Sequence, residues 1–250
     1  MIALSAFEQF EITRLLKWYA NGVDISITNS TVFLLLSLLY FVFLYYYTRL
    51  NKSLIVPNRW QSVLELAYEM VYGVTKDNIG KRWGKYFPLI FSLFMMIVLL
   101  NLFGLVPYTF SPTSHIAVTF GLSLSIFLGA TLLGIANHGL NYFSMFMPAG
   151  SPLGLAPFMI VIELLSHTAK AVSLGVRLAA NITAGHILFA ILSGFVWQML
   201  LAGGLLTFAS IFPMGVVLLV TIIEMAVAVI QAYVFSLLTS IYISESENLH

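Results

Sequence analysis

The chain lacks cysteine and has few charged residues. The absence of cysteine excludes disulfides, thiolate metal sites and thiol chemistry. Charged residues make up only 8% of the 250 residues, whereas a soluble domain carries about 25%. Hydrophobic residues make up 60%, and the formal net charge of +1 gives no sign of nucleic-acid binding. We therefore expect a protein embedded in the lipid bilayer, with room for several spans of roughly 20 residues each.

Other familiar motifs are also missing. No Gly-Lys-Ser/Thr phosphate loop occurs, so we do not expect the chain to bind nucleotide. The ionisable residues show no metal-type spacing, and no metal or cofactor is predicted. The first dozen residues contain Glu8 and Glu11 and lack a basic region followed by an apolar core, which is not typical of a secretory signal.

The distribution of charged residues divides the first third of the chain into an uncharged segment and a basic segment. Residues 28–48 carry no charge and predict the first span, whereas residues 49–85 hold seven basic and three acidic residues. Basic residues near span ends favour the inner side of a membrane, so residues 1–27 are placed outside. Within the basic segment, residues 59–76 have apolar side chains at helical spacing, which predicts an amphipathic helix on the inner surface. A linker helix packed on a partner is the alternative.

Four further apolar segments complete the predicted fold. The second and third spans are expected at 86–108 and 115–138, and two long helices at 157–201 and 205–243. At about 1.5 Å per residue, each long helix is roughly twice the thickness of the hydrocarbon layer, so we expect both to tilt strongly. The sequence thus predicts an all-α polytopic membrane protein. We expect a single domain with one surface helix and five embedded helices, of which the last two form a hairpin.

The two long helices carry the polar residues expected at depth in the membrane. These are Glu163, His167, Lys170, Arg177, Asn181 and His186 on the fourth helix, and Glu224 and Gln231 on the fifth. Ionisable groups at such depth are functional candidates by default. Arg177 is the most informative, because arginine keeps its charge and a lone one at a helix centre costs at least ~2.5 kcal/mol. No acid lies within one helical turn, so the expected partner is a carboxylate on another helix or another subunit.

Helical spacing arranges the residues of the fourth helix. At about 100° per residue, Glu163, Lys170, Arg177 and Asn181 form one stripe. His186 lies about 180° from Arg177 around the axis and faces a different neighbour.

The fifth helix carries a stripe of its own, because Glu224 and Gln231 are seven residues apart. If the two long helices run antiparallel, Glu224 approaches His186 while Gln231 approaches Arg177. Small residues around both stripes permit close approach of a neighbouring helix.

Several of these residues also have a structural interpretation. Asn181 and Gln231 are equally well explained as hydrogen-bonding links between helices. We favour His167 as a structural or interfacial histidine and Lys170 as a side chain that extends to the membrane interface. Glu163, near a helix start, is open to an interfacial interpretation.

Arg177, His186 and Glu224 together favour a functional interpretation. Histidine and glutamate exchange protons near neutral pH when their environment shifts their pKa values. Arginine does not lose its proton and acts as an electrostatic gate.

At these residues the sequence resembles a known family. The run SLGVRLAAN at 173–181, followed by AGH at 184–186, resembles the signature of subunit a of the F-type ATP synthase. Further matching segments, which extend the resemblance to essentially the whole chain, are YFP at 86–88, NLFGLVPY at 101–108, PAGSP at 148–152 and IQAYVF at 230–235.

The resemblance implies a proton-translocating stator subunit whose long hairpin faces a ring of c subunits. The peripheral-stalk subunit b and other membrane-sector subunits are the further partners that it implies, and ATP chemistry would belong to partner subunits. It makes Arg177 the essential gate opposite the c-ring carboxylate, between two aqueous half-channels. The implied residues are His186, Glu224, Asn181 and Gln231 for the outer half-channel, and Glu163 and Glu245 for the inner one.

The source of the chain is also implied by the resemblance. Bacterial relatives usually have an acid where His186 stands and a histidine where Glu224 stands. In this chain the two residue types are exchanged between these positions. This exchange and the short N-terminus resemble the mitochondrial members of the family, especially the fungal ones. This implies the mitochondrial inner membrane, with the N-terminus in the intermembrane space and the C-terminus toward the matrix.

Two other functions stay as alternatives. A secondary proton-coupled transporter would show inverted repeats and broken helices in both halves, and no duplication is evident. A structural membrane anchor is opposed by the cost of burying Arg177 together with His186 and Glu224.

Overall fold

The computed structural model describes residues 11–17, 19–20, 23–24, 26–50, 59–106, 109–139, 141–142 and 156–247. In this part of the chain, five helical segments are long and apolar enough to cross a membrane. This confirms the predicted all-α polytopic membrane protein.

The helices have the following bounds. They are α1 (Asn29–Leu50), α2 (Arg59–Ile79), α3 (Trp83–Gly104), α4 (Ile116–His138), α5 (Ala156–Ala202), α6 (Leu205–Ala209) and α7 (Ile211–Glu247). A 3-10 turn joins α2 to α3 at Gly80–Arg82, and another precedes α4 at Pro112–Ser114.

Several helix ends differ from the prediction. The second span ends at Gly104 rather than near residue 108, and the last helix is divided into α6 and α7. α7 also continues past residue 243 to Glu247. The tail remains helical because its side chains find partners: Ser244 donates to the carbonyl of Asn78, and Ser246 donates to that of Ala130.

The chain forms two compact units, each with its own packing. The first unit comprises Met1–Leu50, Met95–His115 and Leu178–Gln231, and the second comprises Asn51–Phe94, Ile116–Arg177 and Ala232–His250. The prediction of a single membrane domain over residues 1–250 stays a prediction.

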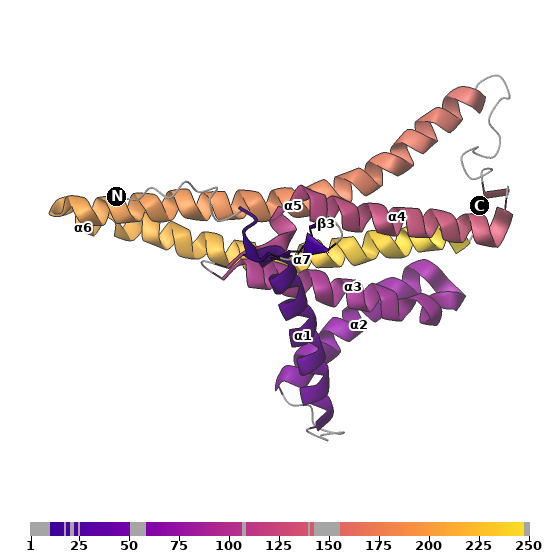
Figure 1. Cartoon of the computed structure of the whole chain (residues 1–250), viewed down its shortest axis with the longest axis horizontal. Helices are drawn as coiled ribbons and strands as arrows, with labels where there is room; N and C mark the ends of the chain where they lie inside the picture. The colour runs from indigo at the N-terminus through magenta and orange to yellow at the C-terminus, as the bar shows by residue number, and fades with distance from the viewer. Residues whose placement is uncertain are drawn as a thin grey trace. The chain divides into compact units, whose positions relative to one another are not determined.

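The first unit is organised around a helix hairpin. The second half of α5 and the first half of α7 run side by side and are joined through α6 (Figure 1). Gly203 and Gly204 make the turn with φ of 69° and 62°, a backbone region in which glycine lacks the steric cost of a side chain.

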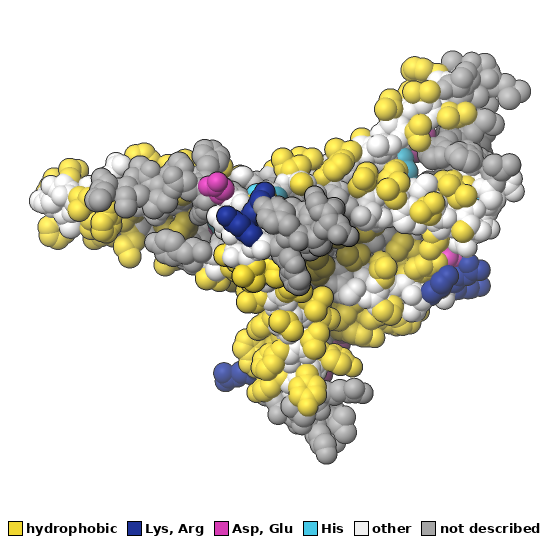
Figure 2. All heavy atoms as spheres, in the orientation of Figure 1, with side chains coloured by type: hydrophobic (Ala, Val, Ile, Leu, Met, Phe, Trp, Pro, Cys, Tyr) yellow, Lys and Arg dark blue, Asp and Glu magenta, His cyan; other side chains and the backbone are white. Residues whose placement is uncertain are grey.

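α1 packs within the same unit through aromatic contacts. Tyr40 lies edge-on to Phe103 at 5.5 Å between ring centroids, and Phe33 lies 6.4 Å from Phe110. Most of the other described side chains of α1 are apolar and at least partly exposed, as Figure 2 shows, and Leu39 is 65% exposed. Such a surface suits contact with lipid.

Two short antiparallel strand pairs, which the sequence did not predict, precede α1. β1 (Arg14–Leu16) pairs with β4 (Ile27–Thr28), and β2 (Tyr19–Ala20) pairs with β3 (Val23–Asp24).

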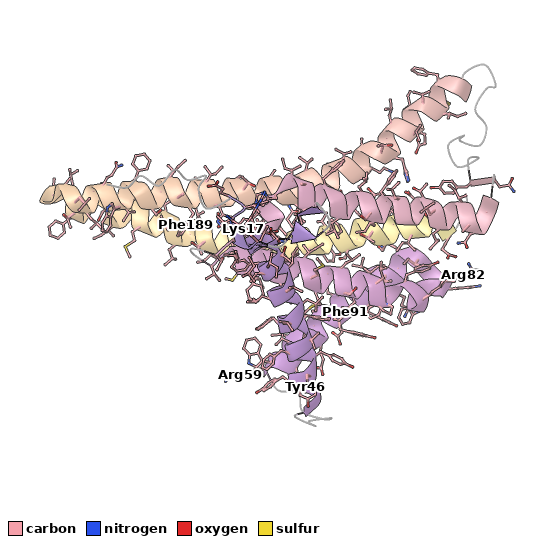
Figure 3. All side chains as sticks on the ribbon, in the orientation of Figure 1. Lys17, Tyr46, Arg59, Arg82, Phe91 and Phe189 are labelled. Carbon is pink, nitrogen blue, oxygen red and sulfur yellow. The ribbon has the colours of Figure 1, made fainter. Side chains whose placement is uncertain are left out.

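The second unit contains α2, the start of α3, α4, the first half of α5 and the end of α7. Aromatic rings join α2 to α3, with Tyr68 at 4.8 Å from Phe87 and 5.8 Å from Phe91, which Figure 3 labels. α4 lies beside the end of α7 (Figure 1). The role of α2 as a helix on the membrane surface stays a prediction.

α4 and the first half of α5 approach closely within the second unit. A Cβ built on Gly175 would lie 2.9 Å from the α-carbon of Phe120 and 2.6 Å from the hydroxyl of Ser123. A side chain at position 175 would therefore push the two helices apart. The contact lies two residues before Arg177, so it fixes α5 next to the arginine.

Candidate functional site

Arg177 lies on an open face of α5. Its neighbours on that face are Ser173, Val176, Ala180 and Ala184, which are all exposed, as is Arg177 itself. The four neighbouring side chains are uncharged and are small or branched, so they leave the guanidinium of Arg177 accessible. Within the part of the chain that the structure describes, Arg177 has no hydrogen bond or salt bridge.

Glu224 lies against the backbone of α5 in the first unit. A Cβ built on Gly185 would lie 2.8 Å from Cδ of Glu224, so a side chain at position 185 would displace the carboxyl group. Gly185 directly precedes His186, and the hairpin thus places Glu224 beside the histidine-bearing segment. Oε1 of Glu224 is buried and has no hydrogen-bond partner among the described residues.

His186 lies close to the end of α3. A Cβ built on Gly104 would lie 3.8 Å from Nε2 of His186 and 3.0 Å from Cβ of Ser111. The imidazole of His186 is half-buried. The close packing at Gly104 therefore brings a hydroxyl-bearing segment and the histidine to one place.

That hydroxyl-bearing segment follows α3 and is buried. Ser111 and Thr113 are each 2% exposed, and their hydroxyls lie 3.1 Å apart. Thr183 of α5 donates a hydrogen bond of 3.1 Å to the carbonyl of Ser114. These residues were not predicted as site residues, although their density of hydroxyl groups in the sequence was the available signal for a polar lining.

Asn101 is a second residue that the sequence did not single out. It is fully buried in α3, where Nδ2 donates a hydrogen bond of 3.2 Å to the carbonyl of Ala228 in α7. Its Oδ1 is buried without a hydrogen-bond partner in the described part of the chain. The sequence feature that could have indicated Asn101 is its amide side chain inside the long apolar run of the second span.

The remaining predicted outer residues lie on the same two helices. Gln231 is 9% exposed, and Asn181 is half-buried. The approach of Gln231 to Arg177 stays a prediction.

The two predicted inner residues belong to the second unit. Glu163 and Glu245 are both half-buried. Oε2 of Glu245 lies 3.7 Å from Nδ1 of His167, and Oε1 lies 3.9 Å from Nζ of Lys170. His167 and Lys170, for which the sequence favoured structural or interfacial roles, thus meet a predicted site residue.

A further polar cluster surrounds the end of α7. The side chain of Glu247 is 3% exposed and accepts hydrogen bonds from Arg82 at 2.5 Å, from Asn137 at 3.3 Å and from the hydroxyl of Tyr86. Its backbone carbonyl lies 3.2 Å from Nε2 of His138. Arg82 lies at the turn between α2 and α3 (Figure 3). The cluster borders a cavity of about 610 Å³, and the sequence did not predict it because Glu247 stands in a polar tail.

Comparison with known proteins decides the family. The family model described as "ATP synthase A chain" matches residues 30–244. The chain belongs to the ATP synthase subunit a family. It is 47% identical to ATP synthase subunit a of Metridium senile over 98% of both chains. It is 43% identical to that of Chondrus crispus over 100% of this chain and 98% of the relative, and 44% identical to that of Rhodospirillum rubrum over 98% and 99%.

Membership of the subunit a family confirms the predicted resemblance. A member of this family is a proton-translocating stator subunit in the membrane sector of the ATP synthase, and nothing in the comparisons favours a secondary transporter. The similar chains come from an anemone, an alga and a bacterium at nearly equal identity. The mitochondrial and fungal-like source therefore stays a prediction.

Proposed function

We propose that this subunit a passes protons to and from a ring of c subunits through two half-channels that Arg177 separates. The observation that carries this proposal is the open position of Arg177 on α5. A permanent cation in a membrane helix needs an anionic partner, and none lies beside it in the described part of the chain. A carboxylate presented by the c-ring has the charge that is needed.

The outer half-channel is assigned to His186, Glu224, Asn181 and Gln231. A buried carboxylate oxygen without a protein partner, such as Oε1 of Glu224, requires a proton or an ordered water. The half-buried His186 lies on the segment against which that carboxyl group packs. Histidine and glutamate take up and release protons at physiological pH when their environment shifts their pKa values.

The buried polar residues near His186 support the same assignment. Asn101, Ser111 and Thr113 give the first unit a polar interior that an apolar helix bundle would lack. Buried sites of this kind hold water, and water chains conduct protons.

The inner half-channel is assigned to Glu163 and Glu245. The carboxylate of Glu245 lies 3.7 Å from Nδ1 of His167 and 3.9 Å from Nζ of Lys170. A carboxylate with polar neighbours is suited to take up a proton released from the ring and to pass it on.

The mechanism follows from charge and burial. A proton from the outer half-channel neutralises a ring carboxylate, which then moves into lipid without the cost of a buried charge. After rotation, the carboxyl group meets the inner half-channel and ionises, and Arg177 attracts the anion and blocks direct proton flow. One proton crossing about 150 mV supplies about 3.5 kcal/mol, so several protons are needed for each ATP.

Partners and location complete the proposal. The c-ring faces the open side of α5, and the peripheral-stalk subunit b and other membrane-sector subunits hold the chain in place. We place the protein in the mitochondrial inner membrane, with residues 49–85 in the matrix because of their seven basic residues.

Substitution of Arg177 in the assembled ATP synthase tests this proposal. Arg177→Ala should abolish proton-driven ATP synthesis in proteoliposomes while the complex still assembles. Arg177→Lys should also fail, because a lysine loses its proton when desolvated and lacks the planar guanidinium fork. Normal synthesis in both variants would overturn the assignment of Arg177 as the gate.

A further inference from the structure

His167 is buried between three helices of the second unit. It lies on α5 and is 5% exposed. Its ring centroid lies 5.2 Å from that of Phe127 in α4 and 5.8 Å from that of Tyr242 in α7. The two aromatic rings flank the imidazole and shield it from lipid.

The nearest acidic group is the carboxylate of Glu245. Nδ1 of His167 lies 3.7 Å from Oε2 of Glu245, and that oxygen is buried with no hydrogen bond to any described residue. A small side-chain rotation or one intervening water would complete a hydrogen bond across this distance. The second carboxylate oxygen lies 3.9 Å from Nζ of Lys170, whose side chain is 44% exposed. Glu245 therefore faces a buried imidazole on one side and a partly solvated ammonium on the other.

The second inner carboxylate lies on the same helix as His167. Glu163 precedes it by four residues, which places both side chains on one face of α5, one turn apart. Glu163, Glu245 and Lys170 are the charged side chains around the imidazole. The other titratable groups that face this cluster are the hydroxyls of Tyr242 and Tyr142.

We infer that His167 is a proton-carrying residue of the inner half-channel, and that it links Glu163 to Glu245. The inference rests on the proposed function, because those two carboxylates define the inner path. In one step, the neutral imidazole accepts a proton from the carboxyl group of Glu163 at one ring nitrogen. It then releases the proton of its other nitrogen, Nδ1, to Oε2 of Glu245. One proton moves, the ring is neutral before and after, and rotation of the ring or exchange with water restores the starting tautomer.

Two variants separate proton transfer from packing. His167→Phe keeps an aromatic ring between Phe127 and Tyr242, and His167→Gln keeps hydrogen-bonding groups, but neither side chain takes up and releases protons. Both should slow passive proton flow through the membrane sector by about 100-fold in proteoliposomes of the whole complex, since this is the order of a lost acid–base group. If His167 had only a structural role, at least one of these two variants would conduct protons as fast as the unchanged protein. That result would overturn the inference.

Chemical rescue supplies an independent readout. In His167→Ala, added imidazole should restore proton flow in a concentration-dependent way, and substituted imidazoles should restore it to a degree that follows their own pKa values. If His167→Ala conducts slowly and no imidazole changes its rate, the histidine acts by shape and the inference is wrong.

The same preparation should include Glu245→Gln. If Glu245→Gln conducts normally, the inner path itself is misassigned and the proposed function is at fault. If Glu245→Gln is slow while His167→Gln is unaffected, only the role of His167 fails.

Discussion

Glu224 of α7 packs directly on Gly185 of α5. A Cβ at position 185 would lie 2.8 Å from Cδ and 3.3 Å from Cγ of the glutamate, closer than side chains tolerate without movement. The absence of a side chain at position 185 therefore decides where the carboxyl group of Glu224 lies. Gly194, further along the same helix, has open space around it.

Gly185→Ala should displace the Glu224 carboxyl group and slow proton flow, although it changes no titratable residue. A displacement of about 1 Å at a reacting group costs up to about 100-fold in rate. The measurement is ATP-driven proton pumping by vesicles that contain the assembled complex. Gly194→Ala is the matched control and should pump normally; equal pumping by both variants would show that the position of Glu224 is not critical.

Glu224→Gln should slow proton conduction without loss of the helix, because it preserves the shape and removes the titratable group. His186→Ala should act in the same direction. If both residues serve one path, the double variant should be less impaired than the product of the two single effects predicts. Conduction rates of the four proteins form the double-mutant cycle, and fully multiplicative losses would indicate two independent roles.

Glu247→Gln should destabilise the subunit rather than block protons. The variant loses the charge-assisted hydrogen bond with Arg82 and weakens those with Tyr86 and Asn137. Because the Arg82 side chain is 68% exposed, water screens the ion pair, and we expect a loss of about 1–3 kcal/mol. A lower midpoint of thermal unfolding of the detergent-solubilised complex would show it. Glu69→Gln, at an exposed position on α2, is the control and should leave the midpoint unchanged.

The orientation of the chain can be tested by cysteine labelling, since the sequence contains no native cysteine. Lys81→Cys lies at an exposed position in the basic segment, and Leu205→Cys lies at the hairpin turn, where the leucine is 87% exposed. A membrane-impermeant thiol reagent should reach position 81 only from the matrix and position 205 only from the intermembrane space. The opposite pattern would invert the orientation and exchange the two half-channels.

Much of the candidate site was predictable because it consists of polar residues in apolar surroundings. Arg177, His186 and Glu224 each interrupt a hydrophobic run, and such interruptions are costly enough to indicate function. Glu247 and Ser111 gave no such contrast, because they stand among other polar residues near helix ends. Their burial depends on neighbours that only the folded chain supplies.

The sequence by itself determined the membrane setting, the long helices and the face of each helix that carries polar residues. These follow from hydropathy and from the 3.6-residue period, which are local properties of the chain. Only the tertiary structure decided which residues meet: Glu224 with Gly185, and His167 with Glu245. Such contacts depend on how neighbouring helices are rotated and shifted along their axes, and that register is set by packing between distant segments rather than by any local pattern.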